Sequence, residues 1–264
     1  EDISVDISGT LKLSKGLTCG TTFSMNGVLE ILSGGSVNHL GVAPTYGSSS
    51  TLKYSSGGSY GRYHEWSDDN ASNPGYPHHV QISSGSLDLG NGGTGTTRFL
   101  TGDLTIDASC GFYMNYSSND MTAALTVGGD ITNDGTLSLS DNSGGDISLA
   151  GNFTQNGTFN HNSRKITMTG TDKTISGSAT IEFGYLDIQG NTSLGKTSTI
   201  NNDLSITSGD FDINGKTLYP QANVTRSSGN IVAASASNIT YNNTAYHNIC
   251  AFSDNDITIK TITN

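Results

Sequence analysis

Gly102-Asp103-Leu104-Thr105 is a short phrase that returns along the chain in close variants, and these variants decide the fold. They are Gly129-Asp130-Ile131-Thr132, Gly151-Asn152-Phe153-Thr154 and Asn202-Asp203-Leu204-Ser205. The first three phrases begin 27 and 22 residues apart, and the fourth begins 51 residues later, about two further periods. A period in the twenties made of strand-like pieces is typical of a solenoid, in which the chain winds into stacked coils.

Between these phrases, short runs place apolar residues two apart, which puts them on one face of a β-strand. Examples are Leu137-Ser138-Leu139 and Ile147-Ser148-Leu149. The runs are separated by Asn, Asp and Gly, which turn the chain at low cost. Asn-Gly would also suit antiparallel hairpins, but two or three strands per period favour a wound coil. We therefore expect the third residue of each phrase to occupy an equivalent core position, and these residues are Leu104, Ile131, Phe153 and Leu204.

The composition fits a slim solenoid of 264 residues. Glycine occurs 34 times, about twice its usual share, and charged residues make up 13% against a typical ~25%. Hydrophobic residues are only 33%, but their alternation argues against disorder. We predict an all-β, right-handed parallel β-helix (β-solenoid) of roughly nine to eleven coils over residues 1–264, as a single domain.

One region interrupts this repeating pattern of alternating apolar residues. We expect N-terminal coils at 1–40, a loop or insertion at 41–79, regular coils at 80–219 and C-terminal coils at 220–264. Within 41–79 the alternation fails, most clearly over 55–78, while tyrosines, histidines, the single Trp and three of the four prolines gather there. This pattern predicts one projecting aromatic-rich loop.

The formal net charge of −11 argues against nucleic acid and anionic membranes as partners. No run approaches the ~20 apolar residues of a membrane helix. Residue 1 is Glu and no signal peptide is visible, so we expect either a mature chain or a fragment. Cys19, Cys110 and Cys250 lack metal-ligand spacing. We expect them to be small buried side chains. The alternative is that two of them form a disulfide and the third is a free thiol.

Several phrases together resemble a known family. They are Tyr60-Gly-Arg-Tyr-His-Glu-Trp66, the run 119–127 leading into 129–137, and 169–177 followed by 183–188. Over about residues 25–220 the chain resembles the β-helix repeat regions of large secreted, adhesin-like surface proteins of Bacteroidetes and related bacteria. The resemblance implies a right-handed parallel β-helix, export from the cell and a surface or matrix role. Such proteins often end in a type IX sorting domain, and none is visible here.

An enzyme is the less favoured prediction, although parallel β-helices include polysaccharide lyases and glycoside hydrolases. Glycoside hydrolysis usually needs two carboxyl groups about 5–9.5 Å apart. Glutamate occurs at four positions only, and most aspartates sit in turns. The sole catalytic candidates form one group: Arg62, His64, Glu65, Asp68 and Asp69. We assign no catalytic residue.

The aromatic stretch could instead bind sugar, because Tyr and Trp faces stack on pyranose rings. The candidate residues are Tyr63, Trp66 and Tyr76. The alternative is that these aromatics pin a long loop against the solenoid. No cofactor or metal site is predicted. Ca²⁺ is conceivable at Asp-rich turns, either Asp141-Asn142 with Asp146 or Asp254 with Asp256. The pair His78-His79 lacks a third ligand.

The sequence thus favours an extracellular or cell-surface structural or adhesive protein. A carbohydrate-binding module is the first alternative and a polysaccharide-degrading enzyme the second. Strands are expected from Ile3 to Ile262 without capping helices, and the unpaired edges of terminal coils invite association. The expected partners are therefore another copy of the chain, head to tail in a surface filament, and polysaccharide or other cell-surface glycans. If the chain is a fragment, its neighbours supply the caps.

Overall fold

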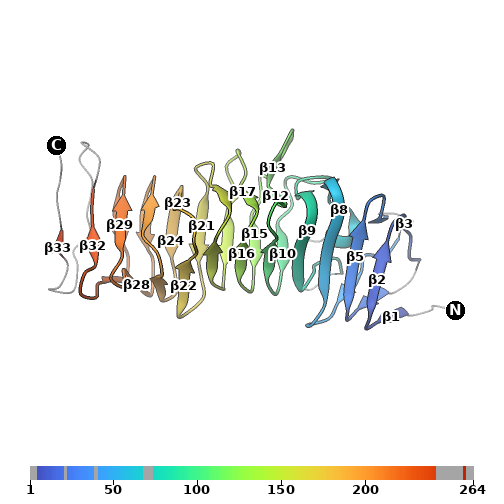
Figure 1. Cartoon of the computed structure of the whole chain (residues 1–264), viewed down its shortest axis with the longest axis horizontal. Coiled ribbons are helices and arrows are strands. Elements are labelled where there is room, and N and C mark those ends of the chain that lie inside the picture. Colours follow the sequence, from blue (N-terminus) through green and yellow to red (C-terminus); the bar gives the residue numbers. More distant parts are fainter. Residues whose placement is uncertain (1–4, 21–22, 39–40, 68–73, 242–257, 260–264) are drawn as a thin grey trace.

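The computed structural model describes residues 5–20, 23–38, 41–67, 74–241 and 258–259. It confirms the predicted fold class, because the chain is all-β and winds into a parallel β-solenoid of about ten turns. The coils stack along one axis, from β2 (Thr10–Leu13) at one end to β32 (Asn238–Ile239) near the other (Figure 1). No helix in the described ranges is long and apolar enough to span a membrane.

Each regular coil contributes one short strand to each of three walls. The first wall belongs to a 14-stranded sheet, and eleven of its strands follow one another in chain order. They are β2, β5 (Val28–Leu32), β8 (Thr51–Gly61), β9 (His79–Asp88), β11 (Leu104–Ile106), β16 (Ile131–Asn133), β19 (Phe153–Gln155), β22 (Lys173–Ser176), β25 (Thr192–Leu194), β28 (Asp210–Asp212) and β31 (Asn230–Val232).

The second wall is a seven-stranded sheet, preceded in the first coils by a separate three-stranded sheet. The seven strands are β10 (Arg98–Leu100), β15 (Leu125–Val127), β18 (Ile147–Leu149), β21 (Lys165–Met168), β24 (Tyr185–Ile188), β27 (Leu204–Ile206) and β30 (Val224–Arg226). The three are β1 (Val5–Ile7), β4 (Phe23–Met25) and β7 (Thr45–Tyr46).

The third wall is assembled from shorter ladders. Its strands are β3 (Gly16–Leu17), β6 (Ser36–Val37), β12 (Gly111–Tyr113), β17 (Thr136–Ser138), β20 (Thr158–Asn160), β23 (Ile181–Phe183), β26 (Ser198–Ile200), β29 (Thr217–Pro220), β32 and β33 (Thr258–Ile259). A small hairpin of β13 (Asn115–Tyr116) and β14 (Asn119–Asp120) is the antiparallel exception within the described chain, where the other paired strands are parallel.

Apolar side chains of the repeated phrase stack in the core. Leu104 pairs with Ile131, and Ile131 pairs with Phe153, as predicted. Leu204 is equally buried, but its predicted equivalence is wrong: it lies in the second wall, between Leu186 and Val224. The physical reason is that the coils shorten. Phe153 lies 22 residues before its first-wall partner and Leu186 only 18 before Leu204, so the phrase shifts from one wall to another.

The turn residues of the phrase join successive coils. The Asp130 carboxylate accepts a hydrogen bond from the Asn152 backbone N–H at 2.7 Å, and the Asn152 side chain accepts one from the Thr174 N–H at 2.9 Å. The glycine that opens the phrase is required by close approach, because a Cβ at Gly151 would lie 2.1 Å from the Gly129 carbonyl oxygen. The aspartates of these turns therefore stabilise the fold through hydrogen bonds between successive coils.

The predicted loop is wrong over residues 55–61. Residues 55–61 continue strand β8, which pairs with β9 through a bulge near Ser55. The alternation is hidden in the sequence because this stretch holds small polar residues and because Gly57 and Gly85 adopt positive φ beside the bulge. Residues 62–67 leave the strand and include a 3₁₀ turn, η1 (His64–Trp66), that is packed inward. Residues 74–78 also lie outside the strands, because β9 begins at His79. Residues 68–73 of the predicted loop lie outside the described residues.

Candidate functional site

The three aromatic residues predicted to bind sugar lie in different environments. Trp66 is fully buried: its indole N–H donates to the Phe99 carbonyl at 2.8 Å, and its ring lies 6.2 Å from the Phe112 ring. Tyr76 is partly buried. Tyr63 keeps 47% of its surface exposed. The burial of Trp66 therefore contradicts the prediction that its ring stacks on a sugar. It agrees with the alternative prediction, in which Trp66 pins the segment around it against the solenoid. Tyr63 alone offers a well-exposed ring.

Glu65, next to Trp66, is also fully buried, at the centre of a cage of hydrogen-bond donors. Its carboxylate accepts from the Tyr63 and Val37 backbone N–H groups at 2.9 and 3.3 Å. The hydroxyls of Tyr60 and Tyr54 also donate to it, at 3.1 and 3.4 Å. The Tyr46 hydroxyl donates to the Glu65 carbonyl at 2.7 Å. The cage ties η1 to β6, β7 and β8, so we assign Glu65 a structural rather than a catalytic role.

Burial dominates the titration of this cluster. It raises the pKa of Glu65, and hydrogen bonds from the Tyr63 and Val37 backbone N–H groups and from the Tyr60 hydroxyl only partly oppose that rise. Burial also raises the pKa of Tyr46, Tyr54 and Tyr60, and the nearby Glu65 charge raises it further. A group whose pKa is higher in the folded than in the unfolded chain stabilises the fold below its unfolded pKa. That stability is lost as the pH rises through the folded value.

We expect Glu65→Gln to flatten this pH dependence. The free energy of unfolding of the wild-type chain, relative to the variant, should fall as the pH rises from about 4, because only the wild-type chain must ionise a buried carboxyl. Gln also disturbs the cage, but that cost does not change with pH. Chemical denaturation at several pH values measures the difference. A difference that stays flat, or grows with pH, would contradict a raised pKa.

Two buried arginines also hold the segment around η1 in place, through hydrogen bonds to backbone carbonyls. Arg62 donates from Nε to the Leu89 carbonyl at 3.0 Å, from Nη1 to the carbonyls of Tyr63 and Trp66, and from Nη2 to that of Asn91. Arg98 donates to the carbonyls of Ser67 and Gly93 at 2.9 and 3.1 Å. Both guanidinium groups are thus held rigidly by backbone acceptors.

These arginines line an open pocket of about 390 Å³ between η1 and the loop after β9. The lining residues are Arg62, Tyr63, His64, Ser67, Asn91, Gly92, Thr96 and Arg98. The sequence pattern indicates candidates among the lining residues of η1 and its neighbours, which are Arg62, Tyr63 and His64. It indicates none among those from Asn91 to Arg98. Asn91 lies 29 residues after Arg62, one coil further on, and donates from its side-chain amide to the Arg62 carbonyl at 2.7 Å. The coil length was the signal that could have paired the two segments.

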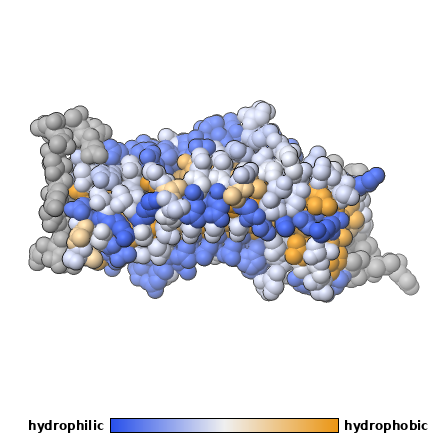
Figure 2. Space-filling model, viewed as in Figure 1, coloured by the Kyte–Doolittle hydropathy of each residue, from blue (hydrophilic) through white to orange (hydrophobic). Residues whose placement is uncertain are grey.

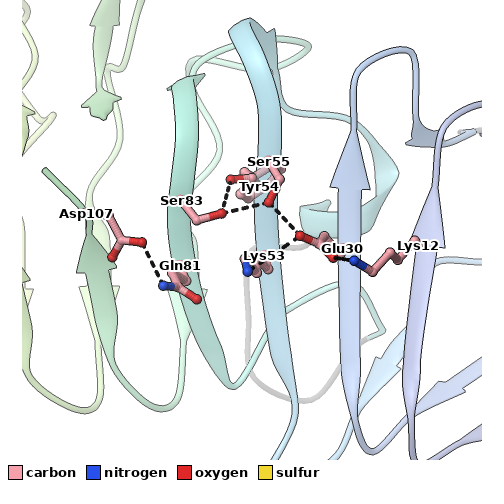
Figure 3. A network of polar contacts seen from close by, with 8 residues as sticks. All are labelled: Lys12, Glu30, Lys53, Tyr54, Ser55, Gln81, Ser83 and Asp107. Carbon is pink, nitrogen blue, oxygen red and sulfur yellow. Dashed lines mark hydrogen bonds and ion pairs between the residues drawn. The ribbon is translucent and has the colours of Figure 1, made fainter. Parts of the chain in front are cut away.

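A second polar cluster lies on the outer face of the first wall (Figure 3). Glu30 forms ion pairs with Lys12 at 3.0 Å and Lys53 at 3.5 Å, and the Ser55 hydroxyl donates to it at 2.8 Å. The hydrogen bond from Lys12 is the largest cause of a lowered pKa for Glu30, and the one from Ser55 adds to it. An ionised, ion-paired carboxylate makes a weak general acid or base, so we interpret this cluster as a link across three coils.

The remaining sequence candidates serve the fold or lie outside the described residues. Asp141 accepts from the Asn115 side chain and Asp146 from the Lys165 N–H. The described ranges contain no group of three or more His, Cys, Asp or Glu that could hold a metal ion. Asp68, Asp69, Asp254, Asp256 and Cys250 are outside these ranges.

Cys19 and Cys110 are free thiols. His78 lies edge-on to His79 and bonds Thr101 at 2.7 Å.

Comparison with known proteins adds no relative: no family model, no curated protein and no solved structure matches the chain.

Proposed function

We propose that this chain is an extracellular structural or adhesive β-solenoid rather than an enzyme. One observation carries the proposal: the stretch richest in catalytic residue types is turned inward, with Glu65 and Trp66 fully buried. The outer surface supports it as well. The face in Figure 2 is largely hydrophilic with scattered apolar residues, and the large apolar side chains exposed in the described chain are Val42, Tyr63 and Tyr185.

Two measurements test this proposal. Incubation with acidic and neutral polysaccharides should release no reducing ends or unsaturated products beyond those seen with heat-denatured protein. Antibodies should label intact cells as strongly as lysed cells if the chain is exported. Catalytic product release, or labelling that requires lysis, would overturn the proposal.

A structural role would also fit head-to-tail assembly, which we propose as its higher-order form. In a parallel solenoid each coil pairs only with its neighbours, so a further copy can extend the ladder by the same backbone hydrogen bonds. Scattering at increasing concentration should show growing assemblies. Deletion of residues 1–8, or separately of 256–264, should reduce their size. A monodisperse monomer at high concentration would exclude this assembly.

Carbohydrate binding is a second candidate, favoured by the exposed Tyr63 ring at the edge of the arginine-lined pocket. On a glycan array we expect Tyr63→Ala to lose binding while the melting temperature stays within a few degrees, because a half-exposed ring contributes little to the core. Val42→Ala, which truncates an exposed apolar side chain elsewhere, is the matched control. Unchanged binding by Tyr63→Ala would remove this candidate site.

A further inference from the structure

We propose that an opening in the third wall, between β20 and β23, binds an uncharged sugar residue that has adjacent free hydroxyl groups. Such a site adds a ligand to the adhesive role and lies in different coils from Tyr63. The scaffold proposal does not depend on it, because that proposal is tested by product release and cell labelling.

The opening is an interruption of the backbone ladder. β20 pairs with β17 and β23 pairs with β26, but β20 and β23 do not pair with each other. The same two coils stay joined through their other strands, β19 with β22 and β21 with β24. The turn before β23 spans residues 177–180, whereas the turn before β20 spans only 156–157. The longer turn displaces β23 from the ladder, in the middle of the stack (Figure 1).

Hydrogen bonds at both corners keep the opening small. The Ala179 N–H donates to the Gln155 carbonyl at 3.1 Å, and the Tyr185 N–H donates to the Arg164 carbonyl at 3.1 Å. The flanking ladders hold the two coils one strand spacing apart, about 4.8 Å, so a further strand does not fit between them. A pocket of about 360 Å³ lies there instead, within the usual range of small-molecule sites. Its lining residues are Gly157, Thr158, Phe159, Ala179, Thr180 and Glu182.

Phe159 supplies an aromatic surface to this pocket. Its partner in the previous coil, Leu137, is fully buried, whereas Phe159 is only partly buried because β23 does not cover it. The Phe159 ring packs edge-on against the rings of Phe153 and Phe183, with centroids 5.3 and 5.9 Å away, which fixes its orientation. A fixed and partly exposed ring can contact the apolar C–H face of a pyranose without further ordering.

Glu182, Thr158 and Thr180 supply hydrogen bonds for the sugar hydroxyls. All three are exposed, and Glu182 is the one charged residue in the lining. A carboxylate accepts through both oxygens, so adjacent hydroxyls can donate to it, and such charge-assisted bonds are stronger than neutral ones. A lining with one carboxylate and no Lys or Arg disfavours acidic sugars. It also offers no second carboxyl group for glycosidic cleavage.

The test compares Glu182→Gln with Asp141→Asn. Each variant removes one negative charge from an exposed side chain, but Asp141 does not line the pocket. Calorimetric titration would use cellotetraose, mannotetraose and a galacturonate trimer as probes. We expect at least one neutral probe to bind the wild-type chain about tenfold more tightly than the galacturonate trimer. Glu182→Gln should weaken that binding about fivefold or more, while Asp141→Asn stays within about twofold of wild type.

Two further variants test the shape of the pocket. Thr180→Trp places a bulky side chain at an exposed lining position, so we expect it to remove binding while the melting temperature stays within a few degrees. Phe159→Leu keeps an apolar side chain at the open edge of the core but removes the ring, and should weaken binding about fivefold or more. Thermal unfolding of each variant shows that it is folded when its binding is measured.

Three outcomes would overturn the site. One is that no neutral probe binds, and a second is that the galacturonate trimer binds at least as tightly as the neutral probes. The third is binding that survives both Glu182→Gln and Thr180→Trp, and its loss in Tyr63→Ala would then assign the sugar to the other candidate site. Binding that is weakened in the Glu182 and Thr180 variants and retained in Tyr63→Ala supports the opening between β20 and β23.

Discussion

Phe153→Asp should destabilise the solenoid by roughly 4 kcal/mol or more, enough to unfold the central coils. Phe153 is fully buried between Ile131 and Ile175 of the neighbouring coils. Its ring lies 5.3 Å from the Phe159 ring and 5.6 Å from the Phe183 ring. A carboxylate there would leave a cavity and lose its hydration without a partner. Chemical denaturation, followed by circular dichroism, measures the loss.

Thr154→Asp is the matched control, because Thr154 follows Phe153 in the same strand and faces outward between Thr132 and Ser176. The same charge on this side remains in water, so we expect a change of less than about 1 kcal/mol. Similar losses in the two variants would contradict the register of β19, because a slip by one residue exchanges the two faces of a strand.

The fold class followed from the sequence because alternation and turn chemistry repeat coil after coil. Leu104, Ile131 and Phe153 could be aligned from the phrase alone, since their coils are of similar length. Leu204 could not. Once the coils shorten, the same turn chemistry serves a different wall, and spacing alone does not say which.

The candidate site was harder to predict for two physical reasons. A β-bulge and small polar residues conceal the strand over 55–61, so the sequence pattern there predicts a loop. Burial also separates two neighbouring aromatics that were both predicted to bind sugar: Trp66 points into the core and Tyr63 outward. Composition alone predicted an aromatic-rich region there but not which ring stays accessible. The second half of the pocket comes from the next coil, and its contribution depends on the three-dimensional stacking.

Trp66→Ala should cost about 3–5 kcal/mol of unfolding free energy. The indole is fully buried against Phe112, and it satisfies the Phe99 carbonyl with its N–H. Truncation removes the largest fully buried side chain of the described residues and takes this donor away from the part-buried Phe99 carbonyl. At this chain length, a loss of that size corresponds to a melting temperature lower by roughly 10 °C.

Two variants separate the contributions of the ring, the N–H and the segment. Trp66→Phe keeps most of the apolar contact but not the donor, so we expect a loss of about 1–3 kcal/mol. Tyr63→Ala removes an exposed ring three residues away and should cost less than about 1 kcal/mol. If Trp66→Ala instead leaves stability unchanged and abolishes glycan binding, the indole faces solvent in the working protein. The buried position of Trp66, and with it the pinning of η1 to the solenoid, would then be wrong.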